Sequence, residues 1–165
     1  MQALLFYKSI VDNLQQSDPK QAEYLEEEVN ILVHKLKFIS PDQRPSVLVL
    51  SQKDSFQPMV NPQVKDTIIV AGGNILTEKF DNPSIILVVQ EDKSLYGNMQ
   101  FILQDEILSR TDAIQSDQIY IIQNQLFGES PESFLADVEA CAEIIQPKYF
   151  IYGRQGVDWV KFDLT

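Results

Sequence analysis

The sequence of 165 residues has the length of one domain, and its 44% hydrophobic and 22% charged residues exclude a disordered or fibrous chain. The single Cys141 excludes a disulfide framework within the chain, and with the single His34 it leaves no His/Cys metal cluster and no thiol–imidazole pair. Lys and Arg number 13 and Asp and Glu 24, so the net charge of −11 repels phosphate backbones and argues against a nucleic-acid partner.

Residues 1–38 predict two helices. Apolar side chains recur at spacings of three and four residues in the first of them: Leu4, Tyr7, Val11 and Leu14. Ser17, Asp18 and Pro19 then supply a turn, a cap and a proline suited to the start of a helix. The second helix has an apolar stripe of its own: Leu25, Val29, Leu32, Val33 and Leu36. We interpret His34, which lies beside that stripe, as a structural histidine and not as a ligand.

Beyond residue 40 the pattern changes to short apolar runs that predict buried strands: Val47–Leu50, Thr67–Val70, Ile85–Val89 and Ile119–Ile122. Near-continuous β-branched runs are typical of strands covered on both faces, as in parallel α/β sheets. All of these runs are too short to cross a bilayer. We therefore predict an α/β fold, namely a three-layer Rossmann-like domain with a mainly parallel sheet preceded by two N-terminal helices.

Helical connections are expected between these strands. The segment Phe56–Asp66 is long enough for a short helix, and Met99–Leu108 has helical spacing. Ser130 and Pro131 predict the cap of a helix whose buried face includes Cys141, an inert thiol on an apolar face. After Pro147 we expect two short strands, Tyr149–Tyr152 and Val157–Leu164, around a turn, with three residues of the second on one face: Val160, Phe162 and Leu164.

No motif in the chain predicts catalysis. The glycines of Ala71–Asn74 lack both the G-x-G-x-x-G spacing and a P-loop lysine, so we interpret them as a tight turn at a strand end that uses a positive φ. Glu91 and Asp92 follow a predicted strand, where paired acids can do acid–base work or hold a cation, or simply be solvated. No nucleophile–base pair accompanies them. We predict no enzyme activity, no cofactor and no metal site.

Five segments in order resemble the C-terminal lobe of the solute-binding proteins of iron-siderophore, haem and cobalamin ABC transporters. They are the long acidic-then-basic second helix running into Arg44–Ser51, then Val70–Ile75, Asn82–Val88, Ala113–Ile122 and Ala136–Phe150. The resemblance covers roughly residues 20–150. It implies an α/β lobe attached to a backbone helix, with ligand held in a cleft against a second lobe, and no N-terminal lobe is present in this sequence.

The departures from the family pattern bear on transport. Ser84 follows Asn82–Pro83, where the family usually has an acidic residue, and the segment between Asn74 and Asn82 is shorter than usual. That segment commonly contains a glutamate that docks on the membrane permease, and Glu78 is the residue here that can stand in for it. Residues 151–165 are additional to the usual end. We expect a single domain of residues 1–165: a helical segment 1–40, an α/β lobe 41–150 and a C-terminal extension 151–165.

Ligands of parallel sheets bind beyond the carboxyl ends of the strands, which predicts a site among four loops: Ser51–Phe56, Gly72–Asn74, Gln90–Tyr96 and Gln123–Phe127. Aromatic and amide groups suit flat ligands with polar rims. The predicted ligand-binding residues are Lys53, Asn74, Gln90, Glu91, Tyr96, Asn124 and Phe127. The alternative is that these are ordinary exposed loop residues.

The resemblance thus implies a non-catalytic module that binds an iron-siderophore, haem or cobalamin. The alternative is a protein-interaction or structural domain that kept the fold and lost ligand binding. The apolar stripes of the two N-terminal helices predict a homodimer, unless the first helix folds back on the second. Residues 1–8 show no basic n-region of a signal peptide. We therefore expect a cytoplasmic protein if Met1 is the native start. If the sequence is a processed or trimmed form, we expect a periplasmic or cell-envelope protein.

Overall fold

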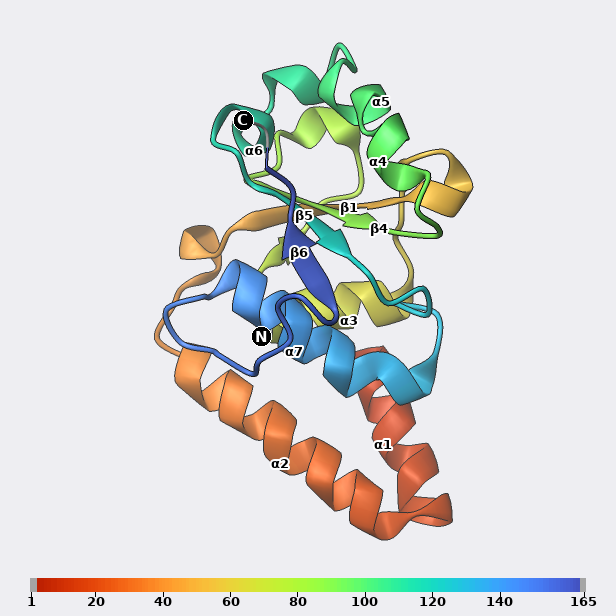
Figure 1. Cartoon of the computed structure of the whole chain (residues 1–165). Coiled ribbons are helices and arrows are strands. Elements are labelled where there is room, and N and C mark those ends of the chain that lie inside the picture. The colour runs from red at the N-terminus through yellow and green to blue at the C-terminus, as the bar shows by residue number, and fades with distance from the viewer. Residues whose placement is uncertain (1–2, 164–165) are drawn as a thin grey trace.

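The computed structural model describes residues 3–163, and it begins with a hairpin of two helices, α1 (Leu5–Ser17) and α2 (Pro19–Leu36). The Asp18 side chain accepts a hydrogen bond from the Gln21 N–H at 3.3 Å, and Pro19 occupies the first turn of α2. Both predicted helices and the predicted cap are confirmed. The hairpin projects away from the α/β body, and its turn lies at the far end (Figure 1).

A mixed sheet forms the centre of the α/β body. Its parallel strands β1 (Ser46–Ser51), β4 (Ile85–Val89) and β5 (Ile119–Ile122) confirm three of the four predicted strands. The full order is β2-β1-β4-β5-β6, in which β2 (Gln57–Pro58) pairs antiparallel with the end of β1. The short β3 (Asn74–Ile75) pairs parallel with the start of β1.

Helices cover both faces of this sheet. On one face lie α3 (Pro62–Val70) and α7 (Phe134–Ile145), with the helical hairpin packed beneath them. On the other face lie the short helices α4 (Leu95–Asn98), α5 (Gln100–Leu103) and α6 (Asp112–Gln115). The predicted three-layer α/β architecture with a mainly parallel sheet is therefore confirmed.

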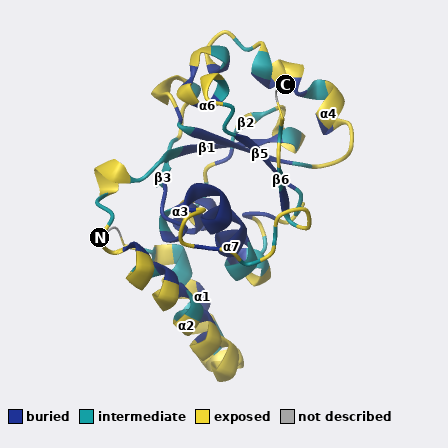
Figure 2. Ribbon diagram, turned by 60° about the vertical axis from the view of Figure 1, so that its left-hand side comes forward, coloured by how far each residue is buried: buried dark blue, intermediate teal, exposed yellow. Residues whose placement is uncertain are grey.

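The alternation of side chains along β1 separates two cores. Val47 and Val49 pack with the helices α2, α3 and α7, whereas Leu48 and Leu50 pack with α4 and α5 on the opposite face. In Figure 2 the strands β1 and β5 and the helices α3 and α7 are mostly buried, and exposed residues gather at the far end of the hairpin. Cys141 is buried in the first of these cores, as expected, and this burial raises its pKa well above the ordinary value.

The prediction of a strand at Thr67–Val70 is wrong, because these residues form the last turns of α3. The helix begins at Asn61, whose side chain accepts the Val64 N–H at 2.8 Å, and Pro62 follows at the first helical position. The glycines therefore follow a helix and not a strand. Gly72 has a φ of +98°, which confirms the tight turn, and this turn leads into β3.

Three smaller predictions differ from the structure. The segment Met99–Leu108 contains α5 and then a loop, so it is not one continuous helix. The Ser130 hydroxyl donates to Glu132 at 2.7 Å and caps no backbone N–H. Residues 149–152 form no strand, because the N–H of Tyr152 donates to the carboxylate of Glu143 and not to a neighbouring strand.

The final strand β6 (Trp159–Lys161) pairs antiparallel with β5 and completes the edge of the sheet. Val160 and Phe162 both pack against the core under α4 and α5, and Leu164 lies outside the described residues. Residues 151–163 thus contribute an edge strand to the sheet.

Candidate functional site

A cavity of about 610 Å³ lies beyond the carboxyl ends of β1 and β4, on the sheet face covered by α4 and α5. We call it the carboxyl-edge pocket. Its residues come from the loop after β1, the segment after β3, the loop after β4, and the region of α4 and α5: Gln52, Ser55, Phe56, Lys79, Glu91, Asp92, Ser94, Asn98, Phe101, Asp105 and Leu108. The topology places the pocket where open parallel sheets bind ligands.

Gln52 fixes two walls of the pocket to each other. Its side-chain oxygen accepts the N–H groups of Glu91 and Asp92 at 2.6 and 3.1 Å. Its side-chain nitrogen donates to a carboxylate oxygen of Asp92 at 3.0 Å and to the Ser94 hydroxyl at 3.1 Å. One amide thus satisfies four groups of the loop after β4, so this loop and the loop after β1 are held as one unit.

The loop after β1 adopts an unusual backbone at the pocket. Ser55 and Phe56 have φ values of +59° and +61°, in the left-handed region that a bulky residue rarely adopts. This turn places the Phe56 ring against the Phe101 ring of α5, with ring centroids 6.4 Å apart. Phe101 is 61% exposed, so the pair offers apolar surface to solvent at the pocket. Local strain of this kind is common at binding sites.

The charges that line the pocket are mostly negative. Hydrogen bonds from the Ser94 hydroxyl, the Ser94 N–H and Gln52 lower the pKa of Asp92. Burial alone would raise the pKa of Asp105, but the N–H groups of Leu108 and Ile107 and the nearby Lys79 together lower it. The Lys79 ammonium lies 3.4 Å from a carboxylate oxygen of Asp105. The Glu91 carboxylate accepts no hydrogen bond within residues 3–163. The pocket therefore favours cationic or neutral groups over anions.

Asp137 of α7 supports the neighbouring loop after β5. It is 2% exposed and accepts hydrogen bonds from Asn124, the Gly128 N–H and the Ser133 hydroxyl. Burial outweighs these donors and raises the pKa of Asp137 to about 7. The Gln125 side chain of the loop after β5 donates to the Glu91 carbonyl of the loop after β4. By holding the loop after β5, Asp137 therefore stabilises the sheet edge where the pocket lies.

The structure brings together only some of the residues that the sequence singles out. Glu91 lines the pocket, and Gln90 braces its loop by donating to the Asp92 carbonyl at 3.1 Å. Tyr96 is 48% exposed on α4 without lining the cavity. Lys53 forms an ion pair with Glu129, which raises the pKa of the lysine and directs it to the loop after β5.

Two of the expected ligand residues are placed elsewhere by the fold. Phe127 is 1% exposed and packs in the core under α3 and α7, so it lines no surface site. Asn74 lies at the opposite edge of the sheet, where it donates to the Pro41 carbonyl at 2.7 Å, because β3 pairs with the start of β1. Asn124 is half-buried and holds Asp137. Glu78 is exposed just before Lys79, and nothing in the structure tests a docking role for it.

Two of the four predicted site loops, those after β1 and β4, line the pocket, but most of the lining side chains were not predicted. Phe56 and Phe101 carry the apolar surface, and Gln52 organises the walls. The sequence placed Gln52 and Phe56 in a predicted site loop without distinguishing them from their neighbours. Phe101 was assigned to a helix with no sign that its ring is exposed. Lys79 joins the pocket only through tertiary folding.

The pocket contains no arrangement that predicts catalysis. Within residues 3–163, no group of three or more His, Cys, Asp or Glu side chains can hold a metal ion. Ser55 and Ser94 line the pocket, and Ser94 donates to Asp92. The only histidine in the sequence, His34, is exposed on α2. The residues present can bind hydrogen-bond donors, cations and aromatic surface. No helix in the described part of the chain is long and apolar enough to span a membrane.

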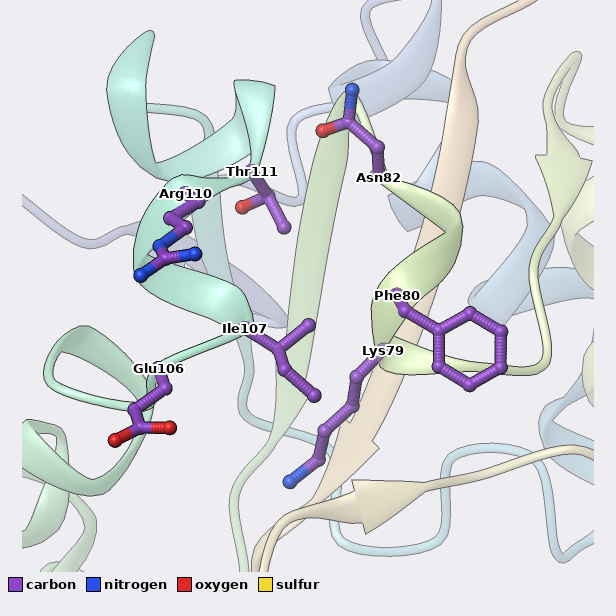
Figure 3. A pocket seen from close by; sticks show the side chains of 7 residues that line it. All are labelled: Lys79, Phe80, Asn82, Glu106, Ile107, Arg110 and Thr111. Atoms are coloured by element: carbon purple, nitrogen blue, oxygen red, sulfur yellow. The ribbon is translucent and has the colours of Figure 1, made fainter.

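A second hollow of about 340 Å³ adjoins the pocket at Lys79. Figure 3 shows its lining side chains, among which Lys79 and Arg110 carry positive charge. Their charged ends point in different directions, and Ile107 lies between them. The two cations therefore do not converge on a common ligand position, and we regard the hollow as an extension of the carboxyl-edge pocket.

No protein-family model and no curated protein matches this sequence. Solved structures do match it in fold. A substrate-binding protein of an ABC transporter from Listeria monocytogenes EGD-e aligns with a TM-score of 0.67 and 15% identity over 86% of this chain and 63% of that one. The haem-complexed IsdE of S. aureus aligns with a TM-score of 0.64 and 18% identity over 85% of this chain and 63% of that one.

A third structure, CeuE of Helicobacter pylori, aligns with a TM-score of 0.61 and 14% identity over 86% of this chain and 52% of that one. The chain thus spans about half to just under two thirds of the length of these proteins. The resemblance noted in the sequence is confirmed for the fold: this chain has the fold of one lobe of the substrate-binding proteins of ABC transporters.

Proposed function

We propose that this chain binds a small molecule in the carboxyl-edge pocket without catalysing a reaction on it. The observation that carries the proposal is the position of the pocket, beyond the carboxyl ends of β1 and β4 in a fold shared with substrate-binding proteins. Its volume of about 610 Å³ is within the usual range for small-molecule sites. No His or Cys lines the pocket, and the lowered pKa of Asp92, which accepts the Ser94 hydroxyl, makes this carboxylate a weak base, which favours binding over catalysis.

The solved structures with this fold suggest the class of ligand. IsdE was crystallised with haem, CeuE with Ni-His and MolA of Haemophilus influenzae with molybdate. For this chain we propose an iron-siderophore, haem or cobalamin, as the sequence resemblance implies. Among these the pocket favours a neutral or cationic complex, since the carboxylates of Glu91, Asp92 and Asp105 outnumber the single Lys79.

Isothermal titration calorimetry tests the proposal. We expect saturable binding of ferrioxamine B, whose iron complex is cationic, or of cyanocobalamin, and weaker binding of haem, whose propionates are anionic. Phe101→Ala removes half of the aromatic pair and should weaken binding by about tenfold. Phe38→Ala is the matched control, because Phe38 is 85% exposed and does not line the pocket.

Two results would contradict the proposal. One is the absence of saturable binding for all three compounds. The other is binding that Phe101→Ala and Phe38→Ala leave equally unchanged, which would place the ligand away from the carboxyl edge.

The alternative function is a protein-interaction domain. It is favoured by apolar residues that stay exposed on the loops after β4 and β5, namely Tyr96 at 48% and Leu126 at 57%. Scattered exposed residues of this kind are normal, whereas a partner would bury them together. Protection of these two loops from hydrogen exchange by a partner protein, without small-molecule binding, would favour the alternative.

A further inference from the structure

Another cavity, separate from the carboxyl-edge pocket and its extension, has a volume of about 640 Å³ and lies between the helical hairpin and the start of α7. We call it the hairpin groove. It is on the sheet face covered by α3 and α7, whereas the carboxyl-edge pocket is on the face covered by α4 and α5. The two sites share no lining residue, so one can be tested without the other.

The floor of the hairpin groove belongs to the hydrophobic core. Ile10, Leu25 and Phe134 are each less than 10% exposed and line the groove. The Phe6 ring of α1 packs on Phe134 with ring centroids 6.0 Å apart, and Leu14 and Leu135 form half-buried walls. The groove therefore has a floor of core side chains, and exposed residues, most of them polar, form its rim.

Contacts at both ends of the hairpin fix the positions of α1 and α2 beside this space. Near the start of α1, the Tyr7 N–H donates to Asp66 of α3 at 2.9 Å and the Tyr7 ring stacks on Phe134. Near the turn, Gln15 donates to Glu26 at 3.2 Å and holds α1 against α2. The far end of the hairpin projects away from α7 (Figure 1), so α1 and α2 cannot close on the helix along their whole length.

The lining of the groove is nearly uncharged in a chain with a net charge of −11. Glu132 is its only charged residue, and this carboxylate accepts the Ser130 hydroxyl at 2.7 Å. The rim carries the amides of Asn13 and Gln21 and the Tyr24 hydroxyl, and none of these side chains has a hydrogen-bond partner within residues 3–163. An apolar cavity with a few free polar groups at its edge fits a neutral, mainly apolar small molecule with one polar group.

We propose that the hairpin groove is a binding site for a neutral, mainly apolar small molecule, separate from the ligand of the carboxyl-edge pocket. The occupant is a small molecule and not a protein segment, because a cavity of about 640 Å³ has the size that holds one small ligand. The apolar part lies on Ile10, Leu25 and Phe134, and the polar group binds the amides of Asn13 or Gln21.

A pair of fluorescent probes tests the proposal directly. N-phenyl-1-naphthylamine is neutral, and 8-anilino-1-naphthalenesulfonate has the same ring skeleton with an added sulfonate. We expect the neutral probe to bind saturably with one site per chain, and the anionic probe to bind at least about tenfold more weakly, since no cation in the lining compensates its charge. Equal affinities, or a signal that does not saturate, would overturn the proposal.

Two further measurements locate the probe. Leu14→Glu places a charge in the wall and should weaken binding of the neutral probe by about tenfold or more. Ile31→Glu is the matched control, because Ile31 is 47% exposed on the same hairpin and does not line the groove. Changes in the amide NMR shifts of the unmodified protein on addition of the neutral probe locate the site without any substitution. Changes in residues 6–14, 21–25 and 131–135 support the hairpin groove. Changes confined to residues 52–56 and 91–108 overturn it.

A second copy of this chain is the competing occupant. If it fills the groove, the probe signal per chain falls as the protein concentration rises and light scattering reports a dimer. That combination would overturn the proposal and assign the groove to an interface between copies.

Discussion

Glu143 of α7 anchors the C-terminal segment, and its replacement provides a sharp test of the packing. One carboxylate oxygen accepts the N–H groups of Tyr152 and Gly153 at 2.7 and 3.0 Å. The other accepts the N–H of Arg154 at 3.1 Å and the indole N–H of Trp159 at 3.0 Å. A single side chain therefore satisfies four donors and connects α7 to the segment that leads into β6.

Glu143→Gln keeps the shape of the side chain but converts one acceptor oxygen into an NH₂ group, which faces two N–H donors. Two hydrogen bonds to a charged group are lost, and each is worth about 1.5–3 kcal/mol. Because residues 151–153 are partly exposed, water can bind some of the released donors, so we expect a loss near the lower limit, about 3 kcal/mol in the free energy of unfolding.

Urea unfolding followed by fluorescence is the assay, because Trp159 is the only tryptophan and donates to Glu143 itself. Glu27→Gln, an exposed position on α2, is the control and should cause no measurable change. Burial alone would raise the pKa of Glu143, but the indole and three backbone donors together lower it. The stabilisation is therefore complete above the ordinary pKa of 4.5 and is lost as the pH falls further through the lower folded-state pKa. Equal unfolding midpoints for the two variants at neutral pH would refute the reasoning.

Three other predictions follow from the described contacts. Burial raises the pKa of Asp137 to about 7, so between pH 4 and 7 the folded state retains a proton that the unfolded state releases. The free energy of unfolding should therefore fall by on the order of 1 kcal/mol per pH unit across this range. Asp137→Asn should remove this slope in unfolding midpoints measured across the same range. Gly128→Ala should destabilise the fold by about 2 kcal/mol more than Gly153→Ala in the same assay, because both glycines have positive φ but only at Gly128 does a Cβ meet a side chain, that of Val64 at 2.4 Å; equal losses would contradict this. Light scattering at tens of micromolar should give a mass near 18.9 kDa, since the hairpin packs on its own chain, and twice that mass would restore the homodimer.

The homodimer illustrates how a sequence pattern leaves a choice open. The apolar stripes of α1 and α2 predict surfaces that must be covered, but they do not specify by what. In the structure Ile10, Leu25 and Leu32 are buried within one chain, because α1 folds back on α2 and both pack on α3 and α7. Spacing predicted most of the buried stripe of α2. On α1 the predicted Leu4, Tyr7, Val11 and Leu14 are only half-buried and Ile10 is the buried residue, because the partner of each stripe depends on the tertiary fold.

The site shows the same division. Three parallel strands were predictable because their apolar runs are continuous, and the carboxyl-edge pocket lies at the edge formed by their carboxyl ends. Individual aromatic residues were not predictable: Phe127 is buried, whereas the half-buried Phe56 packs against the exposed Phe101 at the pocket. The burial of a loop residue depends on which helix packs over it, and spacing in the sequence does not contain that information.

The error at Thr67–Val70 has a local cause. A short β-branched run that is buried has the same appearance in a strand and in a helix, so periodicity cannot distinguish the two. Asn61 and Pro62 were the deciding signal, because an Asn followed by Pro is a typical helix start. The position beside β1 that a strand at this point would have occupied is filled by β2 and β3.

If the Asn61 cap decides the state of this segment, its removal should cost more than an ordinary surface change. Asn61 accepts the Val64 N–H at 2.8 Å and donates to the Gly128 carbonyl at 3.1 Å, so Asn61→Ala loses a cap and a bond to the carboxyl edge. We expect a loss of about 2 kcal/mol in urea unfolding. Asn61→Asp keeps the cap acceptor and should lose about half as much. Asn30→Ala, exposed on α2, is the control. If Asn61→Ala and Asn30→Ala unfold at the same urea concentration, the β-branched run forms a helix without its cap, and tertiary packing alone decides its structure.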